Sequence, residues 1–353
     1  MRLQVRTAST GARHATITIA AAFVLCAAIR ADSPGETRAF RYLMGTSVQV
    51  QAFGGADEAR RQAIDEAFAA IAEVDRLMSN YRPDSELAAV NVSAARAPVE
   101  VTDAMLGVLQ AAQRISAESN GAFDITVGPL MKLWGFFDKR PHVPTDGELA
   151  DVRPLVDYRN ILIDADRHTV RFARSGVEID LGGIAKGFAV ELAAGVLRRH
   201  GLAGLVDAGG NQYVVGAPPG KSRWTFGVKD PDARDGLLGA IDVDDGSVST
   251  SANDSNFLTV DGRRYGHLLD PHTLKPSTAS ESVTIVSRDG TLADAMSKAA
   301  FVLGPRDGIA LIDSMPAVSG LIAYRQRDGR VSVAVSKRLA GAFHPAASRA
   351  LTQ

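Results

Sequence analysis

Apolar and polar positions along the chain follow two periods, one typical of α-helices and one typical of β-strands. The helical period fills five segments: residues 56–78, 102–121, 182–201, 291–303 and 305–314. Alternating or β-branched runs predict strands elsewhere: residues 39–53, three short runs between 155 and 181, several between 203 and 288, and two more at 319–324 and 331–336. The pattern therefore predicts an α+β fold.

Local signals indicate where these elements end and how the strands pair. Thr102 is typical of a helix N-cap, and Asn120-Gly121 is typical of a helix stop. Asp261-Gly262 separates two alternating runs, which is a strong hairpin signal. No internal repeat and no long linker interrupts the chain. We expect one domain over residues 32–353, built on a mostly antiparallel sheet flanked by helices.

The N-terminus differs from the rest of the chain. Arginines precede a short apolar run at residues 15–28, which small and polar residues follow, and this order is typical of a secretory signal peptide. The run is too short for a comfortable membrane span. We expect residues 1–31 to be this signal, with cleavage between Ala28 and Asp32, and the mature protein to have no transmembrane span.

The only cysteine, Cys26, lies inside this segment. Lipid attachment at Cys26 is a minority alternative, because the small residues that usually precede such a cysteine are missing. The mature chain then contains no cysteine, which excludes disulfides and thiolate metal sites. An exported protein without disulfides suits a bacterial periplasm.

Composition narrows the choice of partners. The chain has 353 residues, 46% of them hydrophobic and 22% charged, and its net charge is −1. This composition is that of a globular protein, and no basic excess indicates a nucleic-acid partner.

The segment at residues 291–304 raises a first chemical question. Asp294, Ser297 and Lys298 share one face of a predicted helix that is otherwise apolar nearly all round. Thr291 with Asp294 fits a helix cap, and Asp294 with Lys298 fits a surface ion pair. Alternatively the helix is buried, and then its charges need a partner or a ligand.

Two other segments carry candidate chemistry. In "EIDLGGIAKGFAVE" a predicted strand ends at Asp180, two glycines follow, and Lys186 begins a helix, which suits a phosphate or simply a tight turn. His267 ends another predicted strand before an Asp-Pro turn, where it is either a general base or a structural residue. The turns "DAGGN" and "STSAND" offer backbone amides to an anion.

These segments together resemble one family. The order of "MGTSVQV", "MSNYRPDSELAAVN", "GAFDITVGPLMKLWGF", "IDLGGIAKGFAVE", "DAGGN", "STSA", "HLLDPHT" and "ADAMSKAAFVLG" is similar to that of the ApbE-type flavin transferases, or FAD:protein FMN transferases. The resemblance runs from about residue 41 to 305. It implies the α+β, T-fold-like architecture of that family.

The resemblance also implies an activity and a site. The enzyme would transfer FMN from FAD to a threonine or serine hydroxyl of a partner flavoprotein, in a D-x-x-[ST]-G-A-[ST] type segment, releasing AMP with Mg²⁺. The implied base is His267, and the implied metal contacts are the backbone of Gly183, the Asp294 carboxylate and the Ser297 hydroxyl. The implied FAD contacts are Met44, Tyr81, Ala122, Phe123, Asp124, Asp180, Lys186 and Leu268.

The chain departs from the family's pattern at three positions. Thr273-Leu274 stands where the family usually has Thr-Gly, Ala252 stands where glycine is common, and Lys298 replaces the usual threonine. Without FAD, we expect Lys298 to pair with Asp294 and to weaken metal binding. Trp134, like Tyr81, offers a ring for stacking or for core packing, and the sequence leaves both open.

A second function from another class also fits the sequence. A periplasmic protein that binds or slowly hydrolyses FAD for scavenging would need much of the same site. A sugar- or peptide-binding module would not explain the segment from Asp180 to Lys186.

Overall fold

The computed structural model describes residues 29–33, 35–138, 140–253 and 256–346. Residues 1–28, which include Cys26 and all but the last three residues of the expected signal peptide at residues 1–31, lie outside this range, so that expectation stays a prediction. The helices are α1 (Asp57–Met78), α2 (Glu86–Ser93), α3 (Asp103–Glu118), α4 (Gly128–Leu133), α5 (Asp146–Val152), α6 (Ala185–Arg199) and α7 (Gly290–Ser314). No helix in the described residues is long and apolar enough to cross a membrane.

A large antiparallel sheet dominates the described part of the chain. Its strand order is β1-β2-β3-β7-β8-β11-β16-β17-β18. The strands are β1 (Ile29–Ser33), β2 (Glu36–Leu43), β3 (Thr46–Phe53), β7 (Ala203–Ala208), β8 (Asn211–Val215), β11 (Gly246–Ala252), β16 (Ser282–Ser287), β17 (Val318–Arg325) and β18 (Val331–Val335). The expected α+β class with antiparallel pairing is confirmed.

The remaining strands form small sheets, all antiparallel. They are β19-β10-β9 (Phe343–Pro345, Leu237–Val243, Trp224–Lys229), β12-β13 (Phe257–Val260, Arg263–Gly266), β14-β15 (Leu269–Asp270, Lys275–Pro276) and β4-β6-β5 (Val99–Glu100, Thr169–Phe172, Ile161–Asp164). The hairpin at Asp261-Gly262 is confirmed, with both residues at positive φ.

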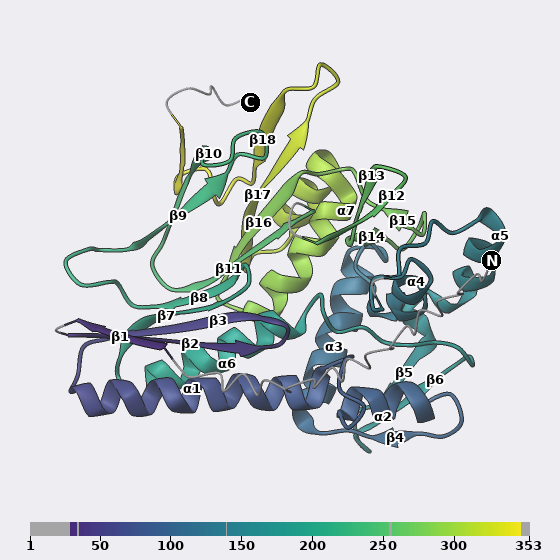
Figure 1. Ribbon diagram of the computed structural model, residues 1–353, viewed down its shortest axis with the longest axis horizontal. Coiled ribbons are helices and arrows are strands. Elements are labelled where there is room, and N and C mark those ends of the chain that lie inside the picture. Colours follow the sequence, from purple (N-terminus) through teal and green to yellow (C-terminus); the bar gives the residue numbers. More distant parts are fainter. Residues whose placement is uncertain (1–28, 34, 139, 254–255, 347–353) are drawn as a thin grey trace, which may run out of the picture.

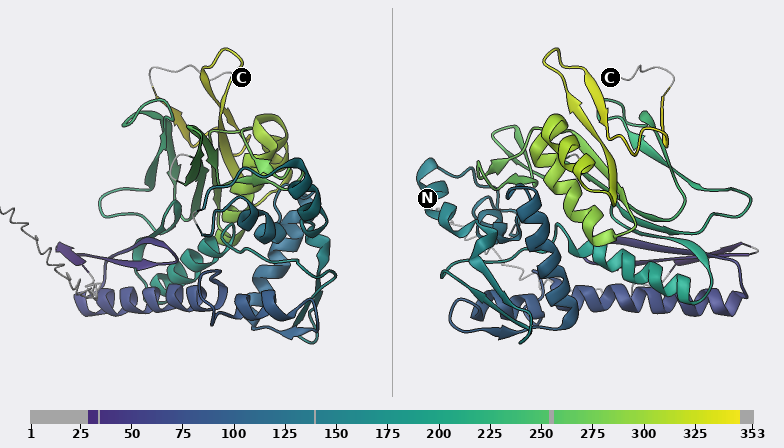
Figure 2. Two further views of the ribbon diagram at one scale, coloured as in Figure 1. Left: turned by 45° about the vertical axis from the view of Figure 1, so that its right-hand side comes forward. Right: turned by 180° about the vertical axis from the view of Figure 1, so that it is seen from behind.

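Alternating side chains let the large sheet pack on both faces. Along β8, Tyr213 and Val215 belong to the main core under the helices, whereas Val214 joins a second core with residues of β9 and β10. Helices α1, α6 and α7 therefore lie against one face of the sheet, and the β9-β10-β19 sheet lies against the other (Figure 1, Figure 2). The segment from α2 to β6 forms a helix-rich part at one end of the sheet (Figure 1).

Two strand predictions were wrong. Residues 39–53 are two strands, because Met44 and Gly45 adopt positive φ and turn the chain back between β2 and β3. Residues 177–180 form no strand. The side-chain amide of Asn91 donates to the carbonyl of Ile179 and accepts from its N–H, so this side chain satisfies the backbone in place of a strand partner.

Candidate active site

Helix α6 begins after a turn at Asp180, which three hydrogen bonds hold in place. Asp180 accepts hydrogen bonds on Oδ1 from Asn80 (2.8 Å) and from the N–H of Gly182 (2.7 Å). Its own N–H donates to the carbonyl of Ile125. Burial raises the pKa of Asp180, while the Gly182 N–H and the nearby Lys186 oppose this shift. Lys186 lies in the first turn of α6, as expected, and its ammonium donates to the carbonyl of Gly182 (3.0 Å).

Helices α6 and α7 each satisfy the N-terminus of the other. The carboxylate of Glu191 on α6 accepts from the N–H groups of Gly290 and Thr291, while Oδ2 of Asp294 on α7 accepts from the N–H of Gly187 (2.8 Å). Carboxylates are stabilising at helix N-termini because the free N–H groups and the helix dipole attract negative charge. This exchange sets the register of the two helices.

The polar stripe of α7 is buried. Asp294 and Ser297 are both 0% exposed. Lys298 forms an ion pair with Oδ1 of Asp294 and donates to Ser297 Oγ (3.2 Å). Ser297 donates to the carbonyl of Asp294 and shares a hydrogen bond with Ser251 on β11. The expected pair of Lys298 with Asp294 is present. The reading of it as a surface pair was wrong, and so was the cap at Thr291, because Asp289 is the N-cap.

His267 directly follows β13 and lies beside this stripe. Its Nδ1 is 2.9 Å from the carbonyl oxygen of Asn256, so Nδ1 carries the proton and Nε2 is the free acceptor. Burial lowers the pKa of His267 to about 4, and the neighbouring ammonium groups of Lys186 and Lys298 contribute. The imidazole is therefore neutral near pH 7.

The run from Ala122 to Asp124 is buried next to the α6 turn. A side-chain carbon placed on Gly183 would lie 3.2 Å from the Phe123 ring and 3.8 Å from Lys298, so these segments meet. The Asp124 carboxylate accepts from Thr126 and from the N–H of Tyr158. These bonds give it a structural role, and a contact of Asp124 with FAD would come from its backbone.

The other expected FAD contacts lie on separate segments. Met44 is in the β2–β3 turn, and Leu268 is buried beyond His267. Tyr81 is 74% exposed, packs edge-to-face on Phe137 and lies near enough to Asp180 for electrostatic interaction. The described contacts thus bring Asp180, Lys186, His267, Asp294, Ser297 and Lys298 together.

Trp134 packs in the core. It is 3% exposed, its indole N–H donates to the carbonyl of Leu274 (3.0 Å), and its ring is tilted against Tyr265. Leu274 itself has φ +59°, which confirms that this position calls for the left-handed conformation where the family usually has glycine.

The residues that position the site were not predicted from the sequence. Asn80 and Asn91 hold the segment before α6, Ser251 binds Ser297, and Glu191 fixes the start of α7. Asn80 and Asn91 both belong to the quoted segment "MSNYRPDSELAAVN", where Asn80 lies in the loop after α1 and Asn91 near the end of α2, and this pair of asparagines was the available signal.

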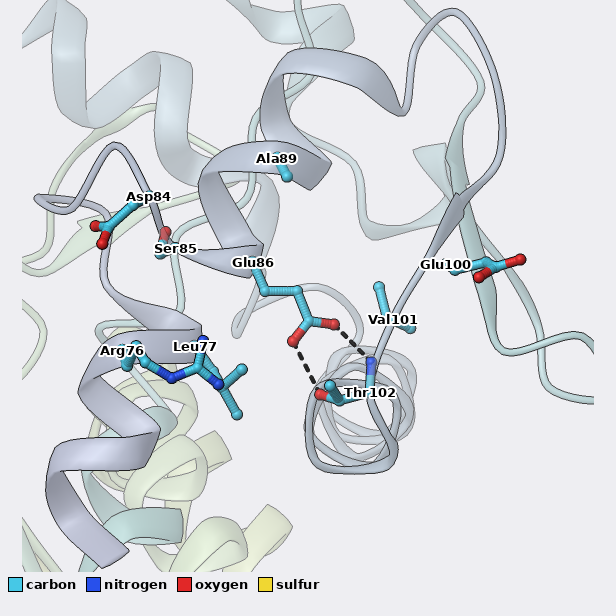
Figure 3. Close-up of a pocket in the computed structure, with 9 residues that line it drawn as sticks. All are labelled: Arg76, Leu77, Asp84, Ser85, Glu86, Ala89, Glu100, Val101 and Thr102. Atoms are coloured by element: carbon cyan, nitrogen blue, oxygen red, sulfur yellow. Dashed lines mark hydrogen bonds between the residues drawn. The ribbon is translucent and has the colours of Figure 1, made fainter. Parts of the chain in front are cut away.

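A surface hollow away from the candidate site is lined by none of the site residues named above. It has a volume of about 520 Å³ and lies between the end of α1, α2 and the start of α3. Figure 3 shows the Glu86 carboxylate reaching the N–H and hydroxyl of Thr102, with bonds of 2.6 and 2.9 Å. Most of its charged side chains have partners, since Glu86 bonds Thr102, Arg76 bonds Glu73 and Asp84 pairs with Arg82, and no histidine lines it.

The oxygen atoms on this face of α7 are of the type that a hard cation prefers, but the Lys298 ammonium already contacts two of them. Among the described residues no three histidine, cysteine or acidic side chains cluster to hold a metal. The Asp294 carboxylate, the Ser297 hydroxyl and the Gly183 carbonyl, which the resemblance implies as metal contacts, are oxygen donors of the type that Mg²⁺ prefers, and Mg²⁺ tolerates a single carboxylate because it keeps several waters. The Lys298 ammonium contacts both side-chain donors.

The sequence pattern of the ApbE family matches residues 44–322. The chain belongs to the ApbE family. A Treponema pallidum protein named FAD:protein FMN transferase is 33% identical over 316 residues, which are 84% of this chain and 87% of that protein. A Klebsiella pneumoniae protein of the same name is 28% identical and covers 83% of this chain and 92% of its own length.

Solved ApbE structures share the fold. The ApbE protein of Thermotoga maritima superposes with a TM-score of 0.78 at 30% identity and covers 88% of this chain and 97% of its own. The flavin transferase ApbE of Vibrio cholerae superposes with a TM-score of 0.77 at 29% identity and covers 86% of this chain and 98% of its own. Family membership confirms the resemblance and the expectation of a flavin-transferase enzyme.

Proposed function

We propose that this ApbE protein transfers the FMN half of FAD to a threonine or serine hydroxyl of a partner flavoprotein and releases AMP. The observation that carries the proposal is the neutral His267 flanked by Lys186 and Lys298 at the start of α6. A pyrophosphate needs cations on its oxygens, and an attacking hydroxyl needs a base. This arrangement supplies both within one site.

The chemical step balances with these groups. The acceptor hydroxyl oxygen forms a bond to the phosphorus of the FMN half, and the bond from that phosphorus to the bridging oxygen breaks, with AMP as the leaving group. The hydroxyl proton passes to Nε2 of His267, because Nδ1 is held by the Asn256 carbonyl. The product is an FMN phosphoester on the acceptor.

The pyrophosphate lies at the start of α6 in this proposal. The free N–H groups and dipole of a helix N-terminus attract anions, and Lys186 in the first turn adds a full positive charge. Asp294, Ser297 and the Gly183 carbonyl would hold Mg²⁺, which when bound neutralises charge developing on the phosphate oxygens. Positioning and charge are what phosphoryl transfer chiefly requires from a protein.

One assay tests this function against the alternative of a binding or hydrolysing protein. The mature protein is incubated with FAD, Mg²⁺ and an acceptor that carries a D-x-x-[ST]-G-A-[ST] segment, and AMP and acceptor mass are measured. Equal amounts of AMP and FMN-modified acceptor support the transferase. AMP without modified acceptor indicates hydrolysis, and neither product indicates storage; both outcomes contradict the proposal. An acceptor with alanine at the hydroxyl position is the control.

We also propose a periplasmic location, which the basic, apolar and small-polar order of residues 1–31 supports. A fusion of residues 1–40 to a reporter that is active only after export tests it. The matched control replaces two apolar residues at positions 15–28 by arginine. A reporter that stays inactive with the native segment contradicts the location.

A further inference from the structure

Lys298 contacts the two side-chain oxygens that a metal would use. Its ammonium pairs with Oδ1 of Asp294 and donates to Oγ of Ser297 at 3.2 Å. The Asp294 carboxylate is fully buried, and the Lys298 side chain is 17% exposed. A buried carboxylate needs a compensating cation, and in this chain the ion pair provides it without any ligand.

The surroundings leave these oxygens little freedom to turn elsewhere. Oδ2 of Asp294 accepts from the N–H of Gly187, so the oxygen directed at Lys298 is the one left for a ligand. The Ser297 hydroxyl donates to the carbonyl of Asp294 (2.7 Å) and meets Ser251 Oγ at 2.7 Å. A divalent ion that binds both side chains must therefore displace the ammonium.

The charges near Lys298 decide when that displacement is favourable. The Lys298 side chain is largely buried and its ammonium pairs with the fully buried Asp294, so it depends on this carboxylate for compensation. Lys186 lies near, and His267 is neutral. A divalent ion entering alone would leave Lys298 without its anion and beside two like charges. A pyrophosphate at the start of α6 offers Lys298 a new anion.

We propose that Lys298 is the resident cation of this site and makes divalent metal binding conditional on FAD. Without FAD the ammonium holds Asp294 and Ser297. With FAD bound, Lys298 turns to a phosphate oxygen, and the two oxygens become available to the metal. This inference rests on the proposed function, because it needs a pyrophosphate at the start of α6.

The test is metal binding, measured without turnover. Mn²⁺ replaces Mg²⁺ as a probe, and free Mn²⁺ is followed by electron paramagnetic resonance with the flavin-free mature protein, with and without FAD. We expect the native protein to bind Mn²⁺ at least about tenfold more weakly without FAD, within the usual 5- to 150-fold range of site coupling. Equal Mn²⁺ affinity with and without FAD overturns the inference.

Two variants assign the effect to the ammonium. Lys298→Thr should bind Mn²⁺ without FAD about as tightly as the native protein binds it with FAD. Lys275→Met is the matched control, because Lys275 is an exposed lysine whose ammonium faces Asp146 and not the metal oxygens. It should leave the weak Mn²⁺ binding of the flavin-free protein unchanged. Equally weak Mn²⁺ binding in Lys298→Thr and the native protein overturns the assignment.

The coupling can also be measured from the FAD side, in the native protein alone. Linkage requires Mn²⁺ to tighten FAD by the same factor by which FAD tightens Mn²⁺, and flavin fluorescence reports FAD affinity. This measurement decides the question even where Lys298→Thr does not fold. If Mn²⁺ leaves FAD affinity unchanged, the inference about Lys298 is overturned but the proposed function stands. If the protein binds no FAD with or without Mn²⁺, the proposed function itself is contradicted.

Discussion

His267 is the single side chain on which the proposed transfer step depends most. We expect His267→Ala to lower the transfer rate by about 10²–10⁴-fold, the usual loss when a general base is removed, with FAD affinity nearly unchanged. Rates of FMN transfer and flavin fluorescence titrations measure the two quantities. An equal loss of affinity and rate would make His267 a ligand contact or a structural residue.

The environment of His267 also predicts a pH profile. Its pKa is lowered from 6.5 to about 4, mainly by burial, so it stays a free base well below pH 6. An ordinary histidine would lose about 30-fold in its neutral fraction between pH 8 and pH 5. We expect kcat/KM, which reports the free enzyme, to stay within about twofold from pH 7 to pH 5. A tenfold fall with a midpoint near 6.5 would contradict this.

The lowered pKa of His267 also makes the stability of the folded protein depend on pH. The unfolded chain binds a proton at His267 below about pH 6.5, whereas the folded protein binds it only near pH 4. The contribution of His267 to stability is thus fully present above pH 6.5 and is lost as the pH falls toward 4.

Leu274 is strained and buried at once. It is 0% exposed at φ +59°, whereas Leu130 on α4, in the same core cluster, is equally buried in a helix. Alanine at either site should lower the free energy of unfolding by roughly 2–5 kcal/mol. Leu130→Gly should be about 1 kcal/mol less stable than Leu130→Ala, but Leu274→Gly should match or exceed Leu274→Ala, because glycine relieves the left-handed strain. Urea denaturation measures all four variants, and the same glycine penalty at both sites would refute the strain.

At the scale of elements, the contact of α6 with α7 places the cations beside the base. Gly187 and Gly290 face each other there, and a side-chain carbon on Gly187 would lie 2.0 Å from the carbonyl oxygen of Gly290 and 2.5 Å from Cβ of Asp294. Only glycine permits this approach, and the approach brings the Gly187 N–H to Asp294. The close approach of α6 and α7 therefore places the ammonium groups of Lys186 and Lys298 near each other.

Two glycines of α6 give a matched pair of variants. Gly187→Ala should destabilise the protein by about 1–3 kcal/mol or more, because backbone atoms must move apart. Gly195→Ala, whose added carbon would meet only the end of Arg199 at 3.7 Å, should stabilise it by up to about 1 kcal/mol, because alanine favours a helix. Thermal unfolding compares them. Equal effects would mean that the close contact does not constrain the site.

At the scale of the whole molecule, the site lies where the helix-rich segment meets the sheet and its helices. Asn91 on α2 joins the two parts by its paired bonds to Ile179, 88 residues away, just before Asp180 and α6. Ile179 is buried, so its backbone groups have no water to replace those bonds.

Removing this amide should therefore affect both stability and FAD binding. We expect Asn91→Ala to lower the free energy of unfolding by about 1–3 kcal/mol and to weaken FAD affinity, because the Asp180 turn loses its support. Val92 is the next residue on α2 and is 67% exposed, so Val92→Ala should change stability by less than about 0.5 kcal/mol. Urea denaturation and flavin fluorescence test both. Unchanged FAD affinity in Asn91→Ala would separate the α2 contact from the site.

The sequence by itself determined the long helices, most strands, the ordered motifs and the family, whereas the short helices α2, α4 and α5 were not predicted. Helical periodicity and glycine stops are local, so α1, α3 and α6 were predicted close to their ends, as was the break before Pro305, where Gly304 has φ +76°. The pairing of Asp294 with Lys298 was also local, since residues four apart on a helix face each other.

Only the tertiary structure decided what those local features mean. Residues 39–53 alternate only in part, and the apolar residues Tyr42 to Met44 continue up to the reversal, so the turn at Met44-Gly45 was recognised only from the pairing of β2 with β3. The run at 177–180 has strand character but pairs with the side chain of Asn91, a partner that no local pattern reveals. Burial under the sheet and against α6 turned the Asp294–Lys298 pair from a surface ion pair into the charged centre of the site. Such burial depends on contacts between residues about a hundred positions apart, which a single sequence does not display.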